Sequence, residues 1–231
     1  MSSIVVLILI PLVLLAADHL GNRKYYLASI VIIILSMIPF FAEFEGRKPH
    51  ARELVTLAVM CAIAVVSRAA FIMLPAFKPL VGIVIITGMA FGPSAGFLTG
   101  AVSGFVSNFI FGQGPYTPWQ MFAFGFAGFV AGLLAKKKMI GEDKPLQTAI
   151  IGAILTLAVI GPILDTCTLF TMASTIDTSS AGAVYISGIP YNAVHAAATF
   201  LTLLLLERPM MEKLERIKIK YGMMSGENDE I

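Results

Sequence analysis

Ionisable and amide side chains are rare in the apolar stretches of this sequence, and those present could bind a polar ligand. Arg68, Asn108, Asp165, Asn192 and His195 all lie within hydrophobic segments. A charged group inside a membrane costs about 2.5–3.5 kcal/mol on insertion scales, so each needs a partner or a function. At a rise of about 1.5 Å per residue, the first four lie about 22–27 Å from the inner boundary, in the outer third. His195 lies lower, about 18 Å up and near the midplane.

Two interpretations of these residues are open. In the first, they line a polar cavity that opens to the outside, where Arg68 and Asp165 orient a ligand or pair with each other. In the second, they are structural, as an ion pair and amides that hold helices together or as long side chains that reach the surface. The common depth of four residues from four helices favours the cavity. His195 taken alone is more often a packing residue.

The segment 107–120 (SNFIFGQGPYTPWQ) adds amides and aromatic rings at the outer end of the predicted cavity. Its glycines and prolines predict a defined turn, and Thr117, Pro118 and Gln120 predict a capping box with proline at the first helical position. Aromatic residues at this depth often only anchor a protein at the membrane interface. Here they alternate with amides and glycines, which favours binding.

Composition explains why polar residues are so informative in this chain. Of 231 residues, 58% are hydrophobic and 13% are charged, with a net charge of +2. These values exclude a disordered chain and a nucleic-acid-binding protein, and they predict an all-α integral membrane protein. Cys61 and Cys167 have neither disulfide-framework nor metal-site spacing. No catalytic motif is present, so we expect no catalytic residues, cofactor or metal.

The charges of the loops give the order and direction of the membrane passages. With the N-terminus inside, twelve Lys and Arg residues fall on the cytoplasmic side and three on the outer side, which predicts that both termini are cytoplasmic. Leu80–Phe91 is short for a passage, yet without it Lys136–Lys138 would lie outside. The eight predicted apolar segments are Ile4–Ala17, Tyr25–Ala42, Leu54–Leu74, Leu80–Phe91, Pro93–Phe111, Pro118–Ala135, Leu146–Phe170 and Ala183–Leu206.

Small residues and prolines add further expectations. Gly88, Gly92, Gly96, Gly100 and Gly104 recur every four residues and predict close internal helix packing. Pro162 and Pro190 interrupt predicted helices near the polar residues, which is typical of transporters. Ala58 and Ala62 form an Ala-x-x-x-Ala pair, which is a weak packing motif by itself.

Residues 52–206 resemble the substrate-binding (S) components of energy-coupling-factor (ECF) transporters, the vitamin-importing branch of the ATP-binding-cassette (ABC) class. The resemblance rests on the segment 52–62 (RELVTLAVMCA), on Phe77-Lys78-Pro79, on the Gly/Ala-rich hairpin and on 111–121 (FGQGPYTPWQM). It implies a six-helix core at residues 52–207, after two accessory helices at 1–45 that depart from the family pattern and before a charged cytoplasmic tail at 208–231. It also implies that Ala58 and Ala62 dock on a shared transmembrane coupling subunit, which two cytoplasmic ATPases drive.

Within this family the sequence is most similar to the S components for cobalamin. Cobalamin would then be the transported substrate, and the protein would lie in the cell membrane. The amides and phosphate of cobalamin suit the predicted polar residues, although pantothenate, a folate or another vitamin would suit them too. Two other classes stay open: a membrane scaffold without a ligand, and an intramembrane enzyme whose Asp165 and His195 approach each other. The candidate substrate-binding residues are Arg68, Phe71, Lys78, Asn108, Gln113, Tyr116, Trp119, Gln120, Asp165, Tyr185, Tyr191, Asn192 and His195.

Overall fold

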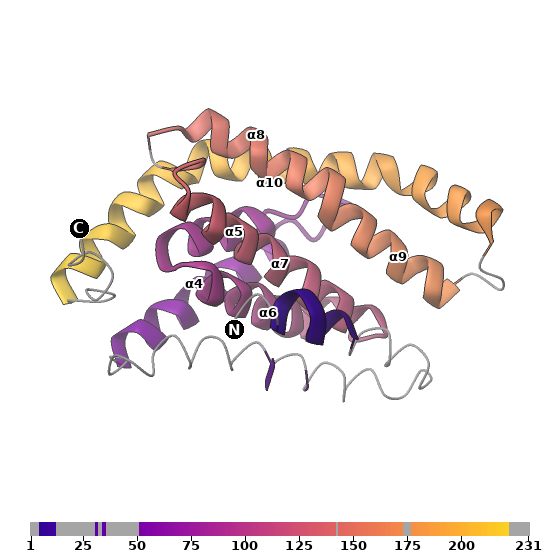
Figure 1. The fold of residues 1–231 in the computed structure, drawn as a ribbon, viewed down its shortest axis with the longest axis horizontal. Coiled ribbons are helices and arrows are strands. Elements are labelled where there is room, and N and C mark those ends of the chain that lie inside the picture. Colours follow the sequence, from indigo (N-terminus) through magenta and orange to yellow (C-terminus); the bar gives the residue numbers. More distant parts are fainter. Residues whose placement is uncertain are drawn as a thin grey trace.

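The computed structural model describes residues 5–12, 31, 34–35, 51–141, 143–172 and 177–221, and the described part of the chain is a helix bundle (Figure 1). The predicted N-terminal segments Ile4–Ala17 and Tyr25–Ala42 therefore lie largely outside the described residues. The helices are η1 (Val5–Leu9), α4 (Ala51–Ala70), α5 (Leu80–Phe91), α6 (Pro93–Phe111), α7 (Tyr116–Lys136), α8 (Pro145–Leu155), η2 (Thr156–Ile160), α9 (Gly161–Met172) and α10 (Thr178–Tyr221).

Six hydrophobic passages make up the bundle between residues 51 and 221. Five helical segments are long and apolar enough to cross a membrane, and one of them runs through α8, the π-helical turn η2 and α9. The sixth is α5, which has the bounds Leu80–Phe91 that the sequence predicts. The all-α membrane fold with a six-helix core is thus confirmed.

The short helix α5 forms the centre of the bundle. Its 12 residues span about 18 Å, and all but Met89 are buried. Contacts with α4, α6, α7 and α10 surround it, which explains why its sequence is apolar on every side. The chain reverses at Gly92, where φ is 89°, and Pro93 opens α6 directly afterwards. A helix enclosed by protein on all sides need not match the full thickness of the membrane.

Glycines bring α5, α6 and α7 into backbone contact. A Cβ atom on Gly88 or Gly96 would overlap the backbone of Gly128 on α7, and one on Gly100 would overlap the backbone of Phe124. Small residues allow such close approach between membrane helices, where dispersion and packing drive association. The prediction that the glycine pattern serves internal packing is confirmed for these three positions.

Helix α10 is the longest element and forms one side of the bundle with α8 and α9 (Figure 1). It has 44 residues, about 66 Å, and contains Pro190 and Pro209. The predicted apolar segment ends at Leu206, and the helix continues through the charged residues that follow it to Tyr221. Its last turn returns to the start of α4, where the guanidinium of Arg52 lies 4.8 Å from the centroid of the Tyr221 ring.

Candidate binding cavity

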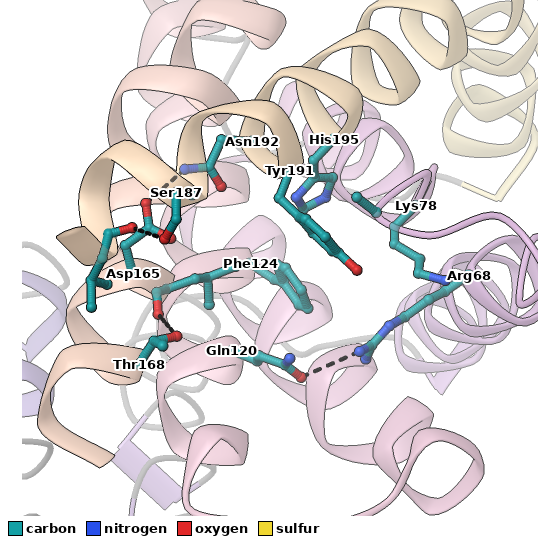
Figure 2. A pocket seen from close by; sticks show the side chains of 14 residues that line it. Arg68, Lys78, Gln120, Phe124, Asp165, Thr168, Ser187, Tyr191, Asn192 and His195 are labelled. Carbon is teal, nitrogen blue, oxygen red and sulfur yellow. Dashed lines mark hydrogen bonds between the residues drawn. The ribbon is translucent and has the colours of Figure 1, made fainter. Parts of the chain in front are cut away.

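A cavity of about 370 Å³ lies between α4, the loop before α5, α7, α9 and α10 (Figure 2). Pockets for small molecules commonly have volumes of about 300–1,000 Å³, so this one can enclose a small ligand. Its lining residues are Arg68, Ala76, Lys78, Gln120, Phe124, Leu164, Asp165, Thr168, Val184, Ser187, Gly188, Tyr191, Asn192 and His195.

Arg68 and Lys78 form a cationic wall on one side of the cavity (Figure 2). The Arg68 side chain is buried, and its Nη1 donates to Ser107 Oγ and to Asn108 Oδ1, the latter at 2.9 Å. Its Nη2 donates to Gln120 Oε1 at 3.4 Å. All three acceptors are neutral, so the guanidinium keeps its full charge and faces the cavity in a fixed orientation.

Lys78 stands beside Arg68 in the loop between α4 and α5. Its Nζ donates to the Phe71 carbonyl at 3.4 Å and lies 4.9 Å from the centroid of the Phe111 ring. The Arg68 guanidinium lies 4.4 Å from the same centroid. Partial burial, and then the nearby charge of Arg68, lower the pKa of Lys78 from its usual range. Two cations therefore share one aromatic ring.

A chain of buried and half-buried side chains connects Arg68 with the loop 112–115. Asn108 Nδ2 donates to Thr117 Oγ1 at 3.0 Å and to Gln120 Oε1 at 2.9 Å. Thr117 Oγ1 also accepts from the Gly114 amide and donates to Gln113 Oε1. The predicted capping box is wrong, because α7 begins at Tyr116 and Thr117 and Gln120 bond this chain of side chains instead. We refer to Asn108, Thr117, Gln113 and Gln120 as the polar relay.

Asp165 and Asn192 form the opposite wall (Figure 2). Asn192 Nδ2 donates to Asp165 Oδ2 at 2.7 Å, which joins α9 to α10. Glycines make room for both side chains: a Cβ on Gly188 would lie 2.5 Å from the Asp165 carboxylate oxygens, and one on Gly161 would overlap the Asn192 amide. Gly161 begins α9 directly after the π-helical turn η2, a feature that is frequent at functional sites.

His195 and Phe124 lie between the two walls. The imidazole is 8% exposed, and it meets the Phe124 ring edge-on with a centroid distance of 6.2 Å. Its Nε2 is buried and has no hydrogen-bond partner among the described residues. Because the Asp165 carboxylate bonds Asn192 rather than His195, the geometry required for the intramembrane-enzyme alternative is missing from the described part of the chain.

The structure brings seven of the thirteen predicted substrate-binding residues to the cavity: Arg68, Lys78, Gln120, Asp165, Tyr191, Asn192 and His195. It places six elsewhere. Asn108 and Gln113 belong to the polar relay, while the Tyr116 hydroxyl donates to the Gly112 carbonyl. Phe71 packs against Phe77, Trp119 against Phe170, and the Tyr185 hydroxyl shares a hydrogen bond with Thr166. Of the five aromatic residues among the thirteen candidates, only Tyr191 lines this cavity.

The other half of the lining was missed by sequence reasoning: Ala76, Phe124, Leu164, Thr168, Val184, Ser187 and Gly188. Helical spacing was the signal for most of them. On α10, positions 184, 187, 188, 191, 192 and 195 follow the three- and four-residue steps of one helix face. Thr168 lies three residues after Asp165 on α9, which is close to one full helical turn. The candidate Tyr185 lies on the neighbouring face of α10, outside the lining of the cavity, and residue type alone could not predict on which face it lies.

With this geometry, the comparison with protein families identifies the chain. A family model described as "ECF-type riboflavin transporter, S component" matches residues 48–211, which include the whole cavity. The chain belongs to this family of S components. No match was found among curated proteins or among solved structures.

Family membership confirms the resemblance in its broader form. An S component is the substrate-specific membrane subunit of an ECF importer and works with an ECF module; it is not itself an enzyme. With the hydrophobic passages described above, it is a multi-pass membrane protein. The family match does not extend to the cobalamin specificity that the sequence resemblance implies.

Proposed function

We propose that this S component captures a vitamin in the cavity between α4, α7, α9 and α10 and delivers it to a shared transmembrane coupling subunit driven by two cytoplasmic ATPases. The observation that carries the proposal is the sorting of polar groups within the cavity. Arg68 and Lys78 lie on one wall, and the hydrogen-bonded Asp165 and Asn192 on the other. Such convergent polar groups within an otherwise apolar pocket orient a ligand.

Cobalamin is our first candidate for the vitamin. Its side-chain amides can bond the Asp165–Asn192 wall and Gln120, and its phosphate can lie against the cationic wall. A corrin ring with its nucleotide tail is several times larger than 370 Å³, so cobalamin would insert only part of its structure. The rest would extend past Ser187 and Tyr191, which are exposed on the α10 wall.

Riboflavin is the second candidate, and two observations favour it. The matching family is described by that vitamin, and the cavity volume suits a three-ring ligand without a large appendage. Its ring system would lie against Phe124 and Tyr191, and its sugar-alcohol hydroxyls would donate to Asp165. Riboflavin carries no group that would neutralise the cationic wall.

Calorimetric titration of the purified full-length chain with cobalamin and with riboflavin tests the proposal. Binding of cobalamin at one site, with an affinity that falls in Asp165→Ala, is the expected result. Binding of riboflavin alone would reassign the vitamin and leave the role in transport intact, and pantothenate or folate binding would do the same. A chain that binds no vitamin, in detergent or in lipid nanodiscs, would overturn the proposal in favour of a membrane scaffold.

The docking part of the proposal rests on one face of α4. Ala58 and Ala62 are exposed, together with the apolar side chains of Val55, Val59 and Val66. Two small residues one turn apart create a flat strip against which another helix can pack closely. This strip lies on the opposite face of α4 from its buried residues Leu57 and Met60, so docking there would leave the core of the bundle undisturbed.

A further inference from the structure

The cationic wall carries two positive charges without a negative partner. Among the described residues, ion pairs form only between Arg208 and Glu212 and between Lys218 and Glu215, both on the C-terminal part of α10. Neither Arg68 nor Lys78 takes part in one. Asp165, which is the one acid among the described residues of the lining, lies on the opposite wall and accepts from Asn192.

The geometry holds the two cations close together although they repel each other. Arg68 and Lys78 lie 4.4 and 4.9 Å from the centroid of the same Phe111 ring. The negative face of an aromatic ring offsets part of their charge, but only by an amount typical of cation–π contacts. Two like charges beside each other in a partly dry site raise the free energy of the empty cavity. An anion bound by both would lower that free energy.

The Arg68 guanidinium also has an N–H group that can donate to a ligand. Two of its N–H groups are engaged by Ser107 and Asn108 and one more weakly by Gln120, which leaves one Nη2 hydrogen without an acceptor among the described residues; the Nε is buried and has none there either. The polar relay fixes the plane of the guanidinium, so this donor needs no reorganisation when a ligand arrives. A planar guanidinium beside an ammonium group is the arrangement that proteins use for phosphates and carboxylates.

We propose that Arg68 and Lys78 form an oxyanion subsite that receives a phosphate or carboxylate group of the vitamin and thereby selects anionic vitamins over neutral analogues. This inference rests on the proposed function, because it assumes that the cavity binds a vitamin. It also predicts a fixed orientation. The anionic group lies at Arg68 and Lys78, and the hydrogen-bond donors of the ligand lie at Asp165.

Two matched ligand pairs test the subsite. Cobinamide phosphate differs from cobinamide, the corrin portion of cobalamin, by its phosphate, and flavin mononucleotide differs from riboflavin by its phosphate. Each is titrated calorimetrically into the full-length wild type, into Lys78→Gln and into Lys213→Gln. The last variant removes the same charge from an exposed position on α10 far from the cavity. Lys78 is half-buried in a loop, so its replacement leaves the helix packing intact, and size-exclusion chromatography checks this.

The phosphate-bearing member of the pair that binds is expected to bind at least about tenfold more tightly, as one charge-assisted hydrogen bond supplies. That preference should largely disappear in Lys78→Gln and persist in Lys213→Gln. Equal affinities within a pair in the wild type, or a preference that survives Lys78→Gln, would overturn the subsite while the proposed function stands. Failure to bind any of the four ligands would overturn the subsite, and failure to bind pantothenate and folate as well would overturn the proposed function. Because the cobinamide and flavin pairs are measured separately, the results also show which vitamin supplies the oxyanion.

Discussion

Arg68 and Asp165 line the same cavity from opposite walls without forming an ion pair with each other. Arg68 is held by Ser107, Asn108 and Gln120, and Asp165 by Asn192. A direct pair would have satisfied both charges and closed the space between them. The two groups instead retain their charges for a third molecule, which is why the cavity is better explained by ligand binding than by helix cross-linking.

Removing either member of the Asp165–Asn192 pair should weaken ligand binding. Asp165→Ala or Asn192→Ala is expected to lower the affinity by more than about tenfold, or 1.4 kcal/mol, because each loses a hydrogen bond to the ligand and also leaves its partner unpaired. Calorimetric titration measures this loss with whichever vitamin the wild type binds. Asp177→Ala is the control, since that carboxylate is exposed just before α10, accepts from the Ser180 amide and does not line the cavity. Unchanged affinity in both cavity variants would make the pair purely structural.

The polar relay should affect ligand binding although only Gln120 among its four members lines the cavity. Thr117→Val keeps the shape of the side chain but removes the acceptor for Asn108 and the donor for Gln113. Leaving buried amides without partners costs about 1–3 kcal/mol, and here part of that cost should appear as misorientation of Arg68. We expect weaker binding of the anionic ligand and little change for its neutral analogue.

The control for Thr117→Val is Thr168→Val, which removes a hydroxyl that lines the cavity and leaves the relay intact. It should change the affinity for both ligands of a pair to the same extent. If Thr117→Val also lowers both affinities equally, the relay stabilises the fold and does not position Arg68.

The depth of the polar residues was predictable from the sequence, whereas their direction around each helix was not. Counting residues along the apolar segments placed Arg68, Asp165 and Asn192 at one level, and the structure has them around one cavity. Asn108 was counted to the same level but points into the relay beneath Arg68. Helices α6 and α7 are apolar and buried around most of their circumference, so no hydrophobic face indicates which side borders a cavity.

The helix bounds show the same contrast. Leu80–Phe91 and Pro93–Phe111 were predicted to the residue, because Pro79, Gly92 and Gly112 end each run clearly. The C-terminal apolar segment ends at Leu206, where charged residues begin, but these mark the end of the membrane segment and not of the helix, which continues to Tyr221. Its residues Glu207, Met211 and Leu214 are buried and keep it packed to Tyr221.

Glycine packing in the centre should tolerate no added methyl group. Gly96→Ala would place a Cβ against the backbone of Gly128, which cannot move without shifting α7. Overpacking of this kind costs about 1–3 kcal/mol, so the midpoint of thermal unfolding in detergent should fall by several degrees. Gly182→Ala meets no atom within 4 Å and should leave the midpoint unchanged. Equal midpoints for both variants would show that α6 and α7 are not in backbone contact.

Binding of an anionic ligand should weaken as the pH rises through the pKa of Lys78. Burial, and then Arg68, lower this pKa, so the ammonium loses its proton earlier than an ordinary lysine, for which the value is about 10.4. The charged form binds the oxyanion, and affinity is therefore highest below the pKa and falls above it. Among the described residues, the other ionisable groups that line the cavity are Arg68 beside Lys78, Asp165 on the opposite wall, and Tyr191 and His195 on α10. Titrations from neutral pH to about pH 9.5 should show the decline in the wild type and a flat profile in Lys78→Gln. Parallel profiles would exclude Lys78 as the titrating group.

Docking on the coupling subunit should depend on the small-residue strip of α4 and not on the cavity. Ala58→Leu with Ala62→Leu fills the strip with bulky side chains and should abolish co-purification with the transmembrane partner, because close backbone approach is lost. The vitamin affinity of the isolated chain should stay within about twofold of the wild-type value, since neither residue lines the cavity.

The chain offers a matched control in Ala193 and Ala197, an exposed pair with the same spacing on α10. The corresponding double leucine variant should still co-purify with the transmembrane partner. If the α4 variant loses vitamin binding as well, these alanines hold the fold together. If both double variants lose the partner equally, added bulk anywhere on the surface is the cause and the strip is not the docking site.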